Sequence, residues 1–175
     1  MATRIPIFLS APTALNPPQT QSYERIVELL RKENLETRAL GRSDYPTEYP
    51  LKEVYMIARR CAGGVVLGYS QMLAPTLQIK PGVRVKGQKY PNIQKNAKFP
   101  TPWNHLEAGI LFSLRLPLMV FREEGISGGV FDNGVTDVFI NRLPVGKIGR
   151  EDEQQLVFSI QIWVARVREH YRKWE

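Results

Sequence analysis

Glu107 is the residue of this sequence whose type and position best suit catalysis. It lies in the segment 101–116, four residues after Trp103 and three before Ile110, so on a helix it borders an apolar stripe. A carboxylate at the edge of such a stripe is partly removed from water, which raises its pKa and favours acid–base or nucleophilic work. The same position also fits a structural glutamate bonded to backbone amides or to an arginine, and periodicity does not separate the two interpretations.

The other reactive residue types exclude several kinds of site. One cysteine, Cys61, and two histidines, His105 and His170, are too few for a cysteine-built or histidine-built metal centre, so we expect no metal and no cofactor. Cys61 closes an apolar helix face and is expected to be a buried thiol. Neither of the common phosphate-binding fingerprints, GxGxxG and GxxxxGK[ST], occurs in the sequence.

Apolar periodicity predicts the elements that must position Glu107. Strands are expected at 4–10, 35–40, 62–69, 118–121 and 138–140, and helices at 22–34, 51–61, 101–116 and 151–174. Ser22 and Thr101 are the expected N-caps of two of these helices, and Pro102 opens the second. The order predicts a single α/β domain over residues 1–175: a doubly wound, mostly parallel five-stranded sheet with helices on both faces.

Ligands of open α/β sheets bind beyond the carboxyl ends of the strands, where strand order reverses. That rule selects the segments 10–21, 43–49, 68–71 and 123–136, together with the helix start at Pro102. The glycine-rich stretch 125–134 has two interpretations, a phosphate-wrapping loop or a surface loop that ends in a turn at 132–134, and the turn signal is the stronger.

Composition and hydropathy indicate a globular protein outside the membrane. The chain has 175 residues, of which 43% are hydrophobic and 23% are charged. No apolar run approaches the ~18 residues that a membrane-spanning helix needs. The single cysteine points to a reducing compartment, so we expect the protein in the cytoplasm.

Positive charge is concentrated in one segment, the insertion 71–100 before the third helix. Between Gln71 and Leu106 there are six basic residues and no acidic one, whereas the remaining 18 basic and 17 acidic residues nearly balance. Such a block attracts the phosphates of a nucleotide or a nucleic acid, or it is a solvated lysine-rich loop; the alternation at 83–85 also fits a hairpin within it. The adjacent aromatics fit single-stranded nucleic acid as well, which we rank below a small nucleotide because no nucleic-acid module surrounds them.

The C-terminal helix at 151–174 has an acidic first turn and an apolar stripe that includes Leu156, Ile160, Trp163, Val167 and Tyr171. Packing into the protein's own core is one interpretation of this stripe. A homodimer seam is the sharper alternative, and it makes a homo-oligomer one of the expected partners.

Four pieces of the chain resemble the nucleoside 2-deoxyribosyltransferase-like and TIR-like superfamily: IPIFLSAP, SYERIVELLRKEN, ARRCAGGVVLGY and PWNHLEAGILFSLRLPLMVF. In that superfamily a first strand ends in a small-residue loop, and a later helix presents a glutamate in an E-x-G motif before the next strand. The matching piece here is Glu107-Ala108-Gly109, with Pro117 opening the following strand. The resemblance covers roughly residues 5–121.

The resemblance implies cleavage or transfer of the N-glycosidic bond of a nucleoside, a nucleotide or an NAD-like dinucleotide. Glu107 would be the nucleophile or would stabilise the oxocarbenium ion at the anomeric carbon, with a small nucleoside or nucleotide as partner. TPWNH replaces the usual D-x-G-T-type lead into the glutamate helix, so the substrate stays open and a sensor that binds a nucleotide without turnover also fits. The implied substrate-binding residues are Ser10, Tyr69, Trp103 and Asn104, and the expected phosphate-attracting residues are Lys86, Lys89, Lys95 and Lys98.

Overall fold

The computed structural model describes residues 4–44, 47–87 and 92–173 and has a parallel sheet at its centre. The strand order is β2-β1-β3-β6-β7, and all four neighbouring pairs are parallel. The chain runs from β1 out to β2 and then returns to β3 on the other side of β1, so strand order reverses between β1 and β3. The predicted doubly wound α/β architecture is confirmed. The strands are β1 (Ile5–Ser10), β2 (Leu35–Arg38), β3 (Gly64–Gly68), β6 (Leu118–Arg122) and β7 (Ile140–Arg142).

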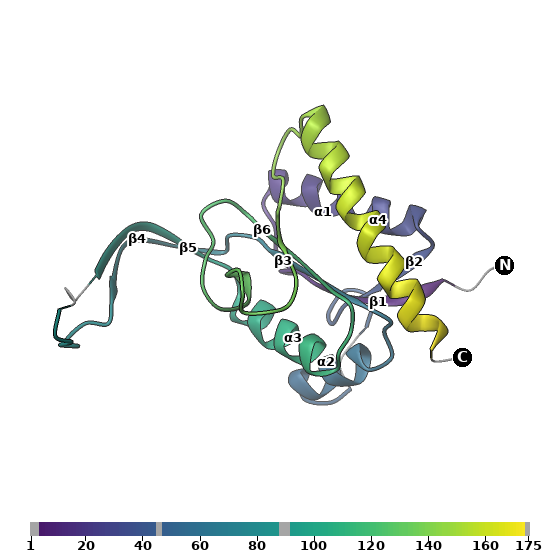
Figure 1. Ribbon diagram of the computed structural model, residues 1–175, viewed down its shortest axis with the longest axis horizontal. Coiled ribbons are helices and arrows are strands. Elements are labelled where there is room, and N and C mark those ends of the chain that lie inside the picture. The colour runs from purple at the N-terminus through teal and green to yellow at the C-terminus, as the bar shows by residue number, and fades with distance from the viewer. Residues whose placement is uncertain (1–3, 45–46, 88–91, 174–175) are drawn as a thin grey trace.

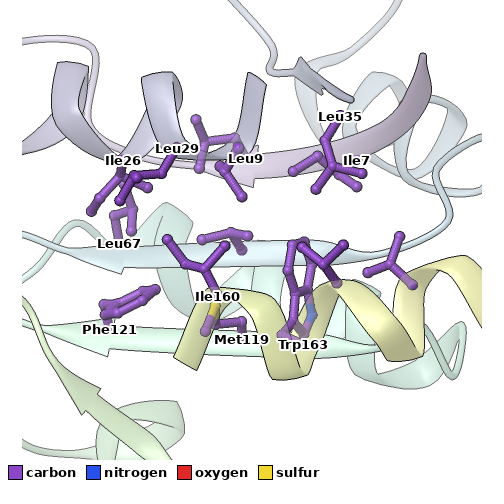
Figure 2. Close-up of a cluster of buried hydrophobic side chains, with 14 of the residues drawn as sticks. Ile7, Leu9, Ile26, Leu29, Leu35, Leu67, Met119, Phe121, Ile160 and Trp163 are labelled. Atoms are coloured by element: carbon purple, nitrogen blue, oxygen red, sulfur yellow. The ribbon is translucent and has the colours of Figure 1, made fainter. Parts of the chain in front are cut away.

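Helices cover both faces of the sheet (Figure 1). On one face lie α1 (Pro17–Lys32) and α4 (Arg150–Arg172), and on the other lie α2 (Pro50–Ala58) and α3 (Pro102–Ser113). Successive strand residues point to opposite faces, so Ile7 and Leu9 of β1 pack under α1 and α4 while Phe8 packs under α2 and α3. Figure 2 shows the first of these two cores, in which Ile26 of α1 and Trp163 of α4 pack on the same face of the sheet.

Helix α1 begins five residues before the predicted start. Its N-cap is Asn16, whose side chain accepts a hydrogen bond from the Gln19 backbone N–H, while the Gln19 side chain accepts from the Asn16 backbone N–H. This reciprocal capping box, followed by proline in the first turn, fixes the start of the helix. The expectation that Ser22 caps the helix is therefore wrong, and Ser22 is a buried residue of the second turn.

Helix α3 begins as predicted, and its start brings it to the carboxyl edge of the sheet. Thr101 is the N-cap, and its hydroxyl oxygen accepts a hydrogen bond from the Asn104 backbone N–H at 3.3 Å. Pro102 occupies the first helical position, where its missing N–H costs nothing. The first two turns of α3 consequently lie beside the end of β1.

The basic insertion forms an arm made of β4 (Met72–Ile79) and β5 (Asn92–Phe99), an antiparallel hairpin. The arm projects from the domain, on the left in Figure 1. Within the described residues the two strands pair only with each other, apart from an isolated bridge between Lys98 and Ile126 at the base. The predicted excursion before the third helix is thus an extended ribbon rather than a loop folded over the sheet.

The apolar stripe of α4 faces the protein's own core. Leu156, Ile160, Trp163 and Val167 are buried, and the indole N–H of Trp163 donates to the Pro117 carbonyl oxygen at 2.9 Å. Core packing accounts for the stripe, so these residues are not available as a dimer seam. No helix in the described ranges is long and apolar enough to cross a membrane.

Candidate active site

A cavity of about 300 Å³ lies beyond the carboxyl ends of β1 and β2, against the first two turns of α3. Its volume is at the lower end of the range for small-molecule sites. It lies beside the strand-order reversal between β1 and β3, which is where open α/β sheets bind ligands. The walls come from three segments that the fold brings together: Ala11, Pro12, Thr13, Leu40, Gly41, Thr101, Trp103 and Glu107.

Glu107 is the one ionisable side chain among the described residues of that wall. It is half-buried, and it forms no ion pair with any described lysine, arginine or histidine. Burial raises the pKa of its carboxyl to about 7, and a hydrogen bond from Ser10 offsets part of that rise. The interpretation of Glu107 as an arginine's partner therefore finds no support among the described residues.

Ser10 and Asn104 form a hydrogen-bonded chain that leads to Glu107. The side-chain amide of Asn104 donates to the Ser10 hydroxyl oxygen at 2.9 Å and also approaches the Leu67 carbonyl oxygen at 3.4 Å. The Asn104 side-chain oxygen in turn accepts from the Thr101 hydroxyl at 3.0 Å. Ser10 is in turn the hydrogen-bond partner that lowers the pKa of the Glu107 carboxyl.

Asn104 has a different place from the one expected of a substrate-binding residue. Only 1% of it is exposed, and it does not line the cavity. Its amide is fully used in holding Ser10, Thr101 and β3 together, so Asn104 positions the carboxylate's partner rather than a ligand. Ser10 is equally buried and, like Asn104, does not line the cavity.

Trp103 gives the cavity its one aromatic wall among the described lining residues. Trp103 is 42% exposed, so it is accessible to a flat ligand. The loop after β1 is held by Arg42, whose guanidinium donates to the Pro12 carbonyl oxygen at 2.6 Å and lies 4.4 Å over the Tyr23 ring. This arginine fixes a wall of the cavity without entering it.

Tyr69 does not belong to this site, contrary to the expectation that it stacks on a base. Its side chain is fully buried in the core beneath α1, and its hydroxyl donates to the Ser22 hydroxyl oxygen at 3.0 Å. Burial raises the pKa of the phenol well above its ordinary value. The ring is therefore part of the core and is out of reach of a ligand in the cavity.

The lysines of the insertion are also not brought to the cavity. Lys86 is exposed at the tip of the arm, and Lys95 is exposed on β5 opposite Thr76. Lys98 lies at the base, where its ammonium donates to the Glu124 carbonyl oxygen at 3.2 Å. Lys89 lies outside the described residues. None of the described three lines the cavity, so the arrangement gives no support to their attracting a phosphate there.

A second network, which sequence reasoning missed, ties the loops after β1, β3 and β6 together. Gln19 is 2% exposed, and its side-chain amide donates to a Glu123 carboxylate oxygen at 2.9 Å and to the Ser70 carbonyl at 3.0 Å. The same Glu123 oxygen accepts from the Ser70 backbone N–H at 2.9 Å. The capping-box spacing of Asn16 and Gln19 is the sequence signal that could have drawn attention to Gln19.

Two other cavities are larger, but in each of them a carboxylate is already bound by other groups of the protein. In the cavity of about 440 Å³ beside α2, Asp44 is paired with Arg38, which lowers the pKa of its carboxyl, and Glu48 is paired with Lys52. The cavity of about 650 Å³ at the ends of β6 and β7 contains Glu123, which is already engaged by Gln19 and Ser70. The cavity at Glu107 is the better candidate because it lies beside the strand-order reversal and because burial raises the pKa of its carboxyl.

Comparison with known proteins gives a structural relative and no sequence family. No family model matches the sequence, and no curated protein matches it. Among solved structures, the chain is similar to the CMP N-glycosidase BcmB of Clostridium botulinum, with a TM-score of 0.51 and 12% identity over 90% of this chain and 98% of that one. At this identity the likeness establishes a shared α/β fold over nearly the whole of both chains.

Proposed function

We propose that this protein cleaves or transfers the N-glycosidic bond of a nucleoside or nucleotide, with Glu107 acting on the anomeric carbon of the sugar. The observation that supports this most directly is the position of Glu107. Its carboxylate lies on the wall of a ligand-sized cavity, accepts a hydrogen bond from Ser10 and has a pKa of about 7. Such a group is available both as a carboxylate and as an acid near neutral pH.

Cleavage of the N-glycosidic bond is promoted by a carboxylate beside the carbon at which positive charge develops. When the bond between the anomeric carbon and the base nitrogen breaks, its electron pair leaves with the base and the sugar becomes an oxocarbenium-like ion. An oxygen of Glu107 then bonds to that carbon or stabilises its charge, and water or an acceptor base completes the reaction by attacking the same carbon. The low dielectric of a half-buried site strengthens the interaction of the carboxylate with that charge.

The cavity around Glu107 combines polar and apolar lining residues. Thr13 and Thr101 carry hydroxyl groups, whereas Trp103, Pro12 and Leu40 are apolar. An exposed indole offers a stacking surface for a planar base. The structural similarity to a protein described as a CMP N-glycosidase adds support, because that protein shares the fold over 90% of this chain.

Release of free base from a panel of substrates tests the proposal. The purified protein is incubated with ribo- and deoxyribonucleosides, their monophosphates including CMP, and NAD, with and without an acceptor base, and products are separated by chromatography. Base release that disappears in Glu107→Gln and persists in Glu124→Gln, a nearby exposed glutamate, supports the assignment. Absence of product from every substrate, with protein shown to be folded by circular dichroism, overturns it.

The same experiment separates catalysis from a nucleotide-binding sensor. A sensor would bind a nucleotide without turnover, and ligand at ~100 times its dissociation constant would then add about 2.7 kcal/mol to the free energy of unfolding. A melting temperature that rises with one nucleotide, without release of its base, assigns binding rather than cleavage to the cavity.

A further inference from the structure

The arm formed by β4 and β5 has no role in the cavity, and its chemistry differs from that of the rest of the molecule. Lys80, Arg84, Lys86 and Lys95 are exposed along it, and no acidic residue occurs between Gln71 and Leu106. Because the remainder of the chain is nearly neutral, the positive field of this protein is concentrated on one projecting ribbon (Figure 1).

We propose that the arm binds double-stranded DNA by placing its tip in the major groove. This inference goes beyond the proposed cleavage of a glycosidic bond and does not depend on it.

The dimensions of the arm match that groove. Paired strands lie ~4.8 Å apart, and strands of eight residues extend for about 27 Å. The major groove of B-form DNA is about 12 Å wide and about 8.5 Å deep, and it admits a two-stranded ribbon with its side chains. The arm has the further advantage that its backbone is unpaired with the domain beyond the bridge at Lys98, so DNA can surround it on several sides.

The tip has the residue types that such a position requires. Arg84 and Lys86 alternate with Val83 and Val85, which are 41% and 45% exposed. The cations reach phosphates or guanine edges, and the aliphatic side chains fit the methyl group of thymine.

Two other partners fit the arm less well. Single strands are held by stacking on several aromatic rings, whereas the sequence of the arm before Phe99 contains one aromatic residue, Tyr90, which lies outside the described residues. A second copy of this chain would bring either another basic arm, which repels the first, or a nearly neutral body without a compensating excess of acidic residues. Charge complementarity therefore favours a polyanion, and the ribbon shape favours a duplex.

Binding is tested with the full-length protein and a fluorescently labelled 20-base-pair DNA, followed by anisotropy. With about four phosphates neutralised, the logarithm of the association constant falls with a slope of about −3.6 against the logarithm of the salt concentration. Affinity should therefore drop on the order of 10²-fold between 50 and 200 mM salt. No binding at 50 mM salt would overturn the proposal.

A matched pair of charge reversals identifies the surface. Arg84→Glu with Lys86→Glu alters the tip, and Lys147→Glu with Arg166→Glu alters exposed residues of the body while lowering the net charge equally. We expect the tip variant to lose most of the affinity and to reduce the salt slope by about 2, and the body variant to remain close to wild type. Equal losses in the two variants would assign the effect to net charge and contradict the proposal.

The competing partners are outcomes of the same series. Tighter binding to a single strand of the same sequence, or to duplex RNA, whose major groove is narrow, would refute insertion into the DNA major groove. A tip variant that retains DNA affinity but shifts a dimer to monomer in sedimentation experiments would instead identify the arm as a contact between protomers. The binding, charge-reversal and sedimentation measurements are all independent of any catalytic activity.

Discussion

The side-chain amide of Asn104 donates to the hydroxyl oxygen of Ser10 over 2.9 Å, and Ser10 is in turn the hydrogen-bond partner of the Glu107 carboxyl. The bond joins the first turn of α3 to the last residue of β1, so the geometry of the carboxylate is determined by the sheet as well as by its own helix. A site built from adjacent rigid elements keeps its side chains in place without a bound ligand.

Replacing the carboxylate of Glu107 by an amide tests the effect of its negative charge on the rate separately from the effect of its size. Glu107→Gln keeps the size of the side chain but removes the negative charge that faces the anomeric carbon. We expect the rate of base release to fall a hundredfold or more, on the order of 3 kcal/mol of lost transition-state stabilisation, while substrate binding changes little. Initial rates and a binding isotherm measure the two quantities, and Glu124→Gln serves as the control. A less stable variant with full activity per folded molecule would make Glu107 structural.

The stability of the same variant should depend on pH in a defined direction. The pKa of Glu107 is raised to about 7 in the folded protein, from 4.5 in the reference state, so the folded state binds more protons between these values. Its contribution is fully favourable below about pH 4.5 and is lost as pH rises through 7. Ionisation of the buried carboxylate therefore destabilises the wild type at high pH. Glu107→Gln has no charge to bury, so its free energy of unfolding should exceed that of wild type by ~2 kcal/mol at pH 8 and by little at pH 5.

Urea unfolding of both proteins at several pH values measures this difference. Burial lowers the pKa of both histidines, but they are common to the two proteins, so their titration cancels in the comparison. A difference that does not vary with pH would contradict the raised pKa.

Removing the hydroxyl of Ser10 should shift the titration of Glu107 upward. The Ser10 hydrogen bond stabilises the ionised carboxylate, so Ser10→Ala raises the pKa of Glu107 further above its ordinary range. If the ionised form is the active one, the rising limb of kcat/KM against pH moves to higher pH while the plateau stays within a few fold. Ser127→Ala, at an exposed loop position, is the control and should leave the profile in place.

The two aromatic residues expected to stack on a base should now differ in their effects. Trp103→Ala removes an exposed cavity wall and should raise KM about tenfold or more with little loss of stability. Tyr69→Phe removes the hydrogen bond to Ser22 in the core and should cost about 1 kcal/mol of stability with KM unchanged. The reverse pattern of KM and melting temperature would put Tyr69 back in the site.

Truncating Gln19 should loosen three loops at once. Gln19→Ala leaves the Glu123 carboxylate without one of its donors and removes half of the capping box of α1. We expect a loss of about 1–3 kcal/mol in the free energy of unfolding, measured in urea. Gln21→Ala, an exposed residue of the same helix, should have an effect within about 0.5 kcal/mol. Similar losses in the two variants would show that the network is unimportant.

Sequence patterns predicted the strands and helices because their apolar spacing is strong. Periodicity placed all five sheet strands within a few residues, and the cap at Thr101 was correct because proline and threonine act locally. The start of α1 was missed although Asn16 and Gln19 have capping-box spacing, because the adjacent prolines suggested a loop. A proline pair is compatible with the first turn of a helix, where no backbone donor is needed.

The candidate site was only partly predictable because its walls depend on tertiary packing. Glu107 and Trp103 followed from helical spacing, but Leu40 and Gly41 lie just before the segment selected after β2. Tyr69 follows a buried strand, and no local pattern distinguishes a ring that turns into the core from one that turns to the ligand edge. The charge of the insertion and its hairpin were also predicted from the sequence. Its projection away from Glu107 was not, because that depends on how β4 leaves β3.

The arm interrupts the chain between β3 and β6, yet these two strands are neighbours in the sheet and pair over five residues. The sheet therefore does not need a continuous chain through the tip in order to stay assembled. Cleavage by trypsin after Arg84 or Lys86 would divide the polypeptide into two fragments that the parallel β3–β6 ladder and both cores still hold in one body. The two fragments, produced separately, would be expected to reassemble into a split form of the same domain.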